Sequence, residues 1–367
     1  MEWGSLPLDL QEEILSRVPA KSLARLRSTS KRWDALLKSR SFTKIHSANA
    51  PKESMVTMLT GDKVYLARFN LHGINNNVAP SLKLTSQLYL KDPHICNVFH
   101  CDGLLLLSTF KENRLEVWNP CSGETKFIKP RNNYFKESDL YALGYDNRYS
   151  CKKYKVLRVD RQDPVGGIYN YEYEIYDFTN ESWKVLGVTT EWGLDPNDRG
   201  VSLKGNTYWV PFSKGPWGYH KFLLCFDFST EEVQSMSLPQ PFPYLVAALS
   251  VVREEQLCLF GYFDFAADSA ELHVWMTTSI GSVMSWSKFF TVKTNGSWDL
   301  FVAGMMSFLA DEQNKVLVCF NNGIYNNFFY IVGETNQIQD VDDHCCVTTS
   351  RSYCSVLMNY VPSLAQI

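Results

Sequence analysis

Histidine and cysteine residues gather just before the first long apolar hairpin of the chain, where they could hold a metal ion. His94, Cys96, His100 and Cys101 are of the types that bind zinc. In a strand, however, alternate side chains share a face, so Cys101 would point away from the other three. We therefore expect ordinary strand residues here, and we expect neither a metal nor a cofactor.

Motifs for other kinds of catalysis are missing from the sequence. It contains no Gly-x-Ser-x-Gly nucleophile elbow, no phosphate-binding glycine loop and no His-Glu-x-x-His zinc motif. Asn295-Gly296-Ser297-Trp298 only faintly resembles the Asp-box of propeller sialidases. These absences favour a non-catalytic protein.

The composition predicts a folded chain with a small basic head and a mildly acidic body. Of the 367 residues, 45% are hydrophobic and 20% are charged, and the formal net charge is −3. This balance favours neither a nucleic-acid binder nor a membrane-surface protein. The head, residues 1–46, nevertheless holds nine Lys or Arg against five Asp or Glu. Basic residues are common on the solvated face of small helices, so a DNA-reading helix is the weaker interpretation.

Targeting and redox features place the protein inside the cell. The start of the chain lacks the basic and apolar regions of a signal peptide, and the longest nearly apolar run, Leu245–Val252, is too short to span a bilayer. The ten cysteines include no CxxC pair, which is typical of reduced thiols. We expect an intracellular protein of the cytoplasm, the nucleus or both, without membrane contact.

Three short helices are predicted in the basic head. Pro7 suits the first helical position and Asp9 the first turn, where the helix dipole favours an acid. Apolar residues then recur at helical spacing up to Pro19, which ends the helix. Ser22 is expected to cap a second helix and Ser30 a third. Because about 40 residues is the lower limit for an independent core, such a module needs a partner surface.

From about residue 55 the sequence becomes a series of apolar strands joined by tight turns. Hairpin turns are predicted at Asp102-Gly103, Lys204-Gly205-Asn206, Glu254-Glu255 and Asp311–Asn314 and, in a looser form, near Asn147. Their regular recurrence, with four strands per unit, is typical of a β-propeller. We predict an all-β propeller of six four-stranded blades, in which the strand near Tyr353–Met358 completes the blade of Met55–Phe69. A pair of β-sandwiches is the alternative.

Three strings in the head share a known order and spacing: Leu6-Pro7-Leu8-Asp9-Leu10, Glu13-Ile14-Leu15-Ser16-Arg17-Val18-Pro19 and Lys31-Arg32-Trp33. In these strings the head resembles an F-box. Ser30 departs from it, since family members often have Cys or another apolar residue there. The resemblance implies binding to a Skp-type adaptor and, through it, to the cullin of a ubiquitin ligase. Transfer of ubiquitin would then belong to other subunits.

The same resemblance implies which residues contact the adaptor. The expected contact residues are Leu6, Pro7, Leu10, Ile14, Leu15, Val18 and Pro19. Leu23, Leu26 and Trp33 are expected to join either that contact or the internal core of the module.

Five strings of the body form a second recognisable pattern: Cys101–Leu107, Val117–Gly123, Tyr141–Asp146, Gly200–Val210 and Tyr360–Ile367. In these strings the body resembles the F-box-associated domain of plant F-box proteins. Gly166-Gly167, Tyr176 and Trp183 also resemble one kelch unit. The organisation that follows is an F-box over 1–46, a linker with the first propeller strands over 47–96 and the propeller domain over 97–367.

Long connections between the hairpins are the expected site for a protein substrate, because long loops on a rigid scaffold often carry recognition. The aromatic residues in these connections are Tyr169, Trp192, Trp217, Tyr219 and Phe242. They are candidate anchors for a partner. The alternative is that each of them packs inside its own loop.

Three classes of function remain open. The favoured class is the substrate receptor of an SCF-type ubiquitin ligase. The second is a protein that binds the adaptor without delivering a substrate, and the third is a propeller enzyme. The sequence does not identify the substrate.

Overall fold

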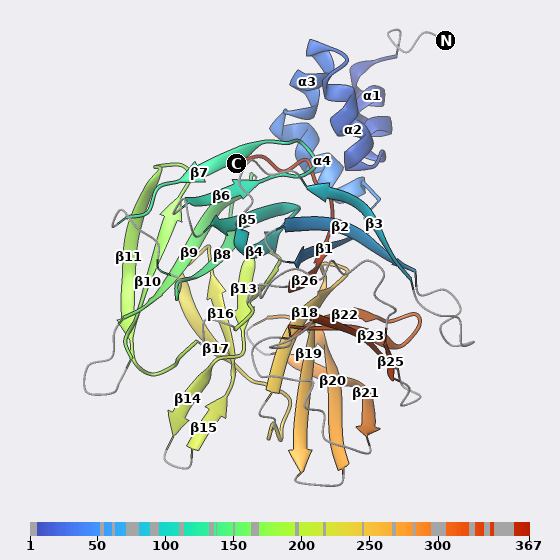
Figure 1. The fold of residues 1–367 in the computed structure, drawn as a ribbon. Helices are drawn as coiled ribbons and strands as arrows, with labels where there is room; N and C mark the ends of the chain where they lie inside the picture. Colours follow the sequence, from blue (N-terminus) through green and yellow to red (C-terminus); the bar gives the residue numbers. More distant parts are fainter. Residues whose placement is uncertain are drawn as a thin grey trace.

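In the computed structural model, a helical head is followed by a six-bladed β-propeller (Figure 1). The structure describes residues 6–51, 55–60, 63–70, 81–88, 95–109, 114–131, 136, 138–149, 151–162, 169–194, 198–215, 218–243, 246–265, 269–281, 284–294, 306–322, 327–333, 338–340 and 356–367. Everything that follows concerns these residues.

The described part of the head contains four helices, so the prediction of three is wrong. They are α1 (Leu8–Ser16), α2 (Ala20–Arg27), α3 (Lys31–Leu37) and α4 (Arg40–Asn49). The additional helix α4 begins where the Ser39 side chain accepts a hydrogen bond from the backbone N–H of Phe42, at 3.2 Å. It is held in place because Phe42 and His46, one turn apart, are both buried. No helix of the described chain is long and apolar enough to cross a membrane.

The predicted helix caps have different outcomes. Ser30 caps α3 as expected, since its side chain accepts a hydrogen bond from the Arg32 backbone N–H at 3.2 Å. The cap predicted at Ser22 is wrong, because α2 already begins at Ala20, directly after Pro19. The fixed φ of a proline suits the start of a helix, so Pro19 both ends α1 and leads into α2.

The six four-stranded sheets follow one another along the chain, as predicted. The first is made of β26 (Val356–Tyr360), β1 (Met55–Thr60), β2 (Lys63–Asn70) and β3 (Ser81–Leu88). The second contains β4 (Ile95–Cys101), β5 (Leu104–Thr109), β6 (Arg114–Trp118) and β7 (Thr125–Ile128). The third contains β8 (Leu140–Asp146), β9 (Lys153–Arg161), β10 (Tyr171–Asp177) and β11 (Ser182–Thr189).

The remaining three blades have the same order of strands, with one insertion. The fourth contains β12 (Val201–Leu203), β13 (Asn206–Trp209), β16 (Leu223–Asp227) and β17 (Glu232–Met236). Between β13 and β16 the chain forms a separate hairpin of β14 (Phe212–Gly215) and β15 (Gly218–Lys221). The fifth contains β18 (Val246–Val252), β19 (Gln256–Phe265), β20 (Ser269–Ser279) and β21 (Ser285–Thr294). The sixth contains β22 (Met306–Asp311), β23 (Val316–Asn322), β24 (Asn327–Gly333) and β25 (Ile338–Asp340).

The ring is closed by pairing the two ends of the propeller sequence. β26 lies antiparallel to β1, with Met55 opposite Tyr360 and Leu59 opposite Val356, which confirms the shared blade. Apolar clusters then fill the spaces between neighbouring blades, including the one between the sixth blade and the first. Because the two ends of the propeller sequence meet in one sheet, backbone pairing closes the ring.

The predicted tight turns lie at one end of the propeller. Asp102 and Gly103 both have positive φ, as do Lys204 and Gly205, which is the geometry of a two-residue hairpin. Because successive strands are antiparallel, the turns between β4 and β5, between β8 and β9 and between β10 and β11 share this end. The longer connections, including the one that carries the β14–β15 hairpin, lie at the opposite end (Figure 1). We call these two ends the tight-turn end and the long-connection end.

Candidate functional site

An apolar surface on α1 faces solvent. Leu8 is 59% exposed, and Leu10 and Ile14 are each 44% exposed, which is unusual for large aliphatic side chains. Pro7, which precedes the helix, is exposed as well. Leu10 and Ile14, which are one turn apart on the same side of the helix, form what we call the α1 face. Neighbouring apolar side chains that remain in water mark a surface for a partner protein.

Other residues of the predicted adaptor contact belong to the interior of the head. Leu15 is 3% exposed and Leu23 is fully buried, and both lie in the module's own apolar core. Val18, Leu26 and Trp33 are half-buried and pack against that core. Leu6 and Pro19 are also half-buried. The predicted set is therefore split, with Pro7, Leu10 and Ile14 facing outwards and Leu15 and Leu23 facing inwards.

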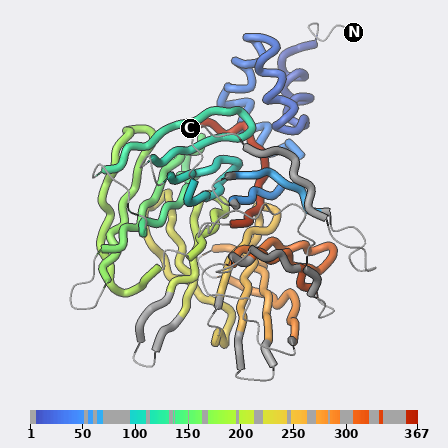
Figure 2. The backbone as a smooth tube through the Cα atoms, viewed as in Figure 1, coloured from blue at the N-terminus to red at the C-terminus, as the bar shows by residue number. Residues whose placement is uncertain are grey.

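The helical head is seated on the tight-turn end of the propeller. Arg27 of α2 pairs with Glu124 in the turn between β6 and β7, at 2.9 Å, and with Asp34 of α3 at 3.1 Å. Apolar contact accompanies this pairing, because Leu364 and Cys121 of the propeller domain pack with the core of the head. In Figure 2 the helices in blue and the C-terminal segment in red lie side by side.

The C-terminal segment, residues 361–367, links the head to the second blade. The side-chain amide of Asn119 donates hydrogen bonds to the carbonyl oxygens of Ser363 (3.2 Å) and Ala365 (2.8 Å). The Ser363 hydroxyl in turn donates to the carbonyl of Asp102, at 2.5 Å. Gly103 is required beside it, because a Cβ at this position would lie 2.5 Å from the Ser363 oxygen. The segment is thus held between the module and the tight turns.

The five aromatic residues predicted for the long-connection end have different environments. Tyr169 is 42% exposed, with the guanidinium of Arg161 over its ring at 4.9 Å. Trp192 is half-buried and stacks on Tyr171, with ring centroids 6.0 Å apart. Phe242 is half-buried against Trp275, at 5.9 Å.

Tyr219 lies on β15, opposite Lys214. Trp217 lies outside the described residues. Of the five, Tyr169 is therefore the side chain that the described structure presents to solvent, whereas Trp192 and Phe242 pack within the propeller.

A buried group of charges supports the long-connection end of the third blade. The guanidinium of Arg158, 1% exposed, donates to a carboxylate oxygen of Asp139 at 2.9 Å and to one of Glu174 at 2.7 Å. The hydroxyl of Tyr141 donates to the same Asp139 oxygen at 2.8 Å. No local pattern in the sequence indicates this group, because its members are far apart in the chain and polar residues on strands usually face water.

Comparison with known proteins matches the head and the propeller to two family models. The family model for the F-box domain matches residues 3–45, and the model for the F-box associated beta propeller domain matches residues 55–367. The chain belongs to the F-box proteins with an F-box-associated propeller.

Relatives of this F-box protein are found in Arabidopsis thaliana. One F-box protein of that plant is 64% identical over 368 residues, which cover 100% of both chains. Another is 46% identical, over 99% of this chain and 98% of the relative. An F-box/kelch-repeat protein is 41% identical, over 100% of this chain and 98% of the relative.

The candidate zinc ligands of this F-box protein are engaged in other contacts. The Cys96 thiol donates to the carbonyl of Ser108 at 3.2 Å, and Nε2 of His100 accepts a hydrogen bond from the Gly103 backbone N–H at 3.0 Å. Burial raises the pKa of the Cys101 thiol to about 12, so it stays protonated at neutral pH. His94 lies outside the described residues, and the described ones contain no group of three or more potential metal ligands.

The half-buried imidazole of His100 makes the stability of the F-box protein depend on pH. Burial lowers the pKa of His100 to about 4, against the opposing effect of Asp102. The unfolded chain therefore takes up this proton near pH 6.5 and the folded chain only near pH 4. Stability from this group is complete above about pH 7 and decreases as the pH falls between these values. The full loss is at most roughly 3 kcal/mol, because the half-buried ring keeps some contact with water.

Replacing His100 by a residue that does not titrate tests its contribution to the pH dependence of stability. His100→Gln keeps an acceptor for the Gly103 N–H but cannot take up a proton. We expect its unfolding free energy, measured in urea at pH 7.5, 6.0 and 5.0, to vary less with pH than that of the wild type. Equal pH dependence in the two proteins would contradict the role of His100.

Proposed function

We propose that this chain is the substrate-recognition subunit of an SCF-type E3 ubiquitin ligase. In this proposal the head binds a Skp-type adaptor, and through it a cullin, while the propeller recruits a protein substrate for ubiquitination. The observation that supports it is the α1 face, where Leu10 and Ile14 are exposed within the segment that matches the F-box model. An apolar face of this kind is stabilised when a partner removes it from water.

The contact between the helical head and the propeller also supports a role in substrate recognition. An adaptor subunit has to hold its substrate at a fixed position relative to the catalytic subunits. The Arg27–Glu124 ion pair and the packing of Leu364 into the module core tie the two parts together. Chain segments that are far apart in sequence contribute to this contact, so the propeller is unlike a module on a free linker.

The substrate surface is proposed to lie at the long-connection end. The opposite, tight-turn end is partly covered by the head and by residues 361–367. Tyr169 is exposed at the long-connection end and is supported by Arg161, as expected of an aromatic anchor. The β14–β15 hairpin extends the same end of the molecule (Figure 1).

A full-length variant that cannot bind the adaptor tests the function as a whole. Leu10→Asp with Ile14→Asp changes only exposed residues, so the core of the head is retained. In plant cells the wild type should co-purify with a Skp-type adaptor and a cullin, and the variant should not. Proteins bound to the propeller should accumulate on the variant, and their ubiquitination should fall.

The outcomes separate the alternatives. A wild type that brings down no adaptor would contradict the proposal altogether. An adaptor complex without any protein whose ubiquitination depends on the chain would instead favour a protein that binds the adaptor without delivering substrates. The Tyr169→Ala variant, with the α1 face intact, should keep the adaptor and release the substrate.

A further inference from the structure

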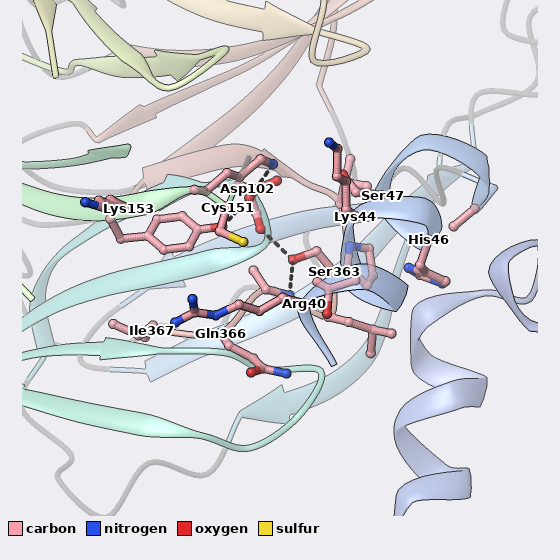
Figure 3. A pocket seen from close by; sticks show the side chains of 18 of the residues that line it. Arg40, Lys44, His46, Ser47, Asp102, Cys151, Lys153, Ser363, Gln366 and Ile367 are labelled. Atoms are coloured by element: carbon pink, nitrogen blue, oxygen red, sulfur yellow. Dashed lines mark hydrogen bonds and ion pairs between the residues drawn. The ribbon is translucent and has the colours of Figure 1, made fainter. Parts of the chain in front are cut away.

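A pocket of about 720 Å³ lies between the helical head and the tight-turn end of the propeller. One wall is α4, a second is the C-terminal segment 361–367, and the rest comes from four turns of the second, third and fifth blades and from Lys126 of β7. We call this space the junction pocket (Figure 3). Its volume falls within the usual range for small-molecule sites.

Basic side chains dominate the charged lining of the junction pocket. Among the described residues that line it, five are Lys or Arg and two are acidic. The basic residues are Arg40, Lys44, Lys126, Lys152 and Lys153, and the acidic ones are Asp102 and Glu254. They come from both modules, since Arg40 and Lys44 lie on α4 and the other three basic residues lie on the propeller.

Among the described residues, two of these cations are paired with carboxylates, and the other three are not. Lys152 pairs with Asp102 at 2.7 Å, and Lys126 pairs with Glu181 at 2.9 Å. No described carboxylate pairs with Arg40, Lys44 or Lys153. Lys153 instead lies over the ring of Tyr149, at 3.7 Å. The charged side chains that line the pocket are therefore more often basic than acidic.

Arg40 and Lys44 also lie close together in the sequence, which adds repulsion between like charges. They are four residues apart on α4, so their side chains are neighbours on one face of the helix. Like charges at this spacing repel each other and destabilise a helix. In Figure 3 Lys44 lies on the α4 side of the pocket and Lys153 on the other side, and the Arg40 side chain extends from α4 towards Ile367. A ligand with several negative charges between these walls would relieve the repulsion and interact with both modules.

We propose that the junction pocket binds a small molecule that carries several phosphate groups. The planar guanidinium of Arg40 suits two phosphate oxygens at once, and the ammonium groups of Lys44 and Lys153 supply point charges on both walls. A small molecule fits the volume of about 720 Å³, which α4, the C-terminal segment and the turns border. Such a ligand holds the head against the propeller. This proposal stands apart from the ubiquitin-ligase function, since it needs neither adaptor nor substrate.

Tripolyphosphate is a suitable probe for this site. Titration of the full-length chain, followed by calorimetry at fixed ionic strength, should show saturable binding. Arg40→Glu with Lys44→Glu should weaken that binding at least tenfold, because two attractive charges become repulsive. Lys153→Glu alone, on the opposite wall, should weaken it as well. The affinity should decrease as the salt concentration rises, as expected for a site made of charges.

A matched charge reversal away from the pocket provides the control. Arg25→Glu with Lys31→Glu makes the same change of charge on exposed residues of the same head that do not line the pocket. It should change the affinity less than twofold. An equal loss in the control and pocket variants would mean general attraction and would overturn the proposal, as would a wild type that binds no tripolyphosphate. A phosphoserine peptide that competes for the pocket and binds more tightly would overturn the assignment to a small molecule.

Discussion

Replacing Leu10 and Ile14 together by Asp is expected to abolish adaptor binding. Full burial of an aliphatic side chain stabilises a complex by about 1.5–3 kcal/mol, and an Asp in the same place would bury a charge. Loss of two such contacts therefore weakens binding by about 3 kcal/mol or more, which corresponds to more than a hundredfold. Both residues are 44% exposed, so the fold of the head should be unchanged. Calorimetric titration with the Skp-type adaptor measures the affinity, and thermal unfolding checks the fold.

Two further variants show whether this effect is specific. Val185→Asp with Val188→Asp alters two exposed aliphatic residues of β11, 40% and 58% exposed, and should leave adaptor binding unchanged. Leu23→Ala, in contrast, should lower stability by about 2–5 kcal/mol, since it creates a cavity in the core of the head. If the Leu10/Ile14 variant binds the adaptor with normal affinity, the α1 face is not the adaptor site.

Only part of the proposed adaptor-binding surface on α1 could be predicted from the sequence. Helical spacing alone placed Leu10, Ile14 and Leu15 on one apolar face, because the three residues share a side of the helix. Whether a given side chain then faces the module core or solvent depends on where the other helices pack. The additional helix α4 and Leu364 from the C-terminal segment take up the space around Leu15 and Leu23. That long-range contact has no counterpart in the local sequence.

The propeller was more predictable than the head. Turn pairs such as Asp102-Gly103 require positive φ, and that requirement is visible in the sequence itself. Their regular spacing then gave the number of blades and the strand that closes the ring. The long connections have no comparable signal, so the hairpin of β14 and β15 and the packing of Trp192 on Tyr171 could not be foreseen.

Removing the buried guanidinium of Arg158 is expected to destabilise the propeller strongly. In Arg158→Leu the carboxylates of Asp139 and Glu174 would stay buried without their main partner, although Arg131 still pairs with Glu174 at 3.0 Å. Breaking a buried ion pair in this way typically costs about 3–5 kcal/mol. We expect a loss of this size in the free energy of unfolding, measured in urea at pH 7.5. Lys293→Leu, which breaks an exposed pair with Glu271, should cost about 1 kcal/mol or less.

The pH dependence of the Arg158→Leu variant distinguishes lost charge pairing from lost packing. Burial already raises the pKa of Asp139 in the presence of Arg158, and without the guanidinium it should rise further. A carboxyl whose folded pKa lies above its unfolded pKa gains stability as the pH falls through the folded value. The difference in the free energy of unfolding between the wild type and the variant should therefore become smaller as the pH is lowered from 7.5 to 5. A deficit that stays constant over this range would show that Arg158 acts through packing of its aliphatic stem, and not through its charge.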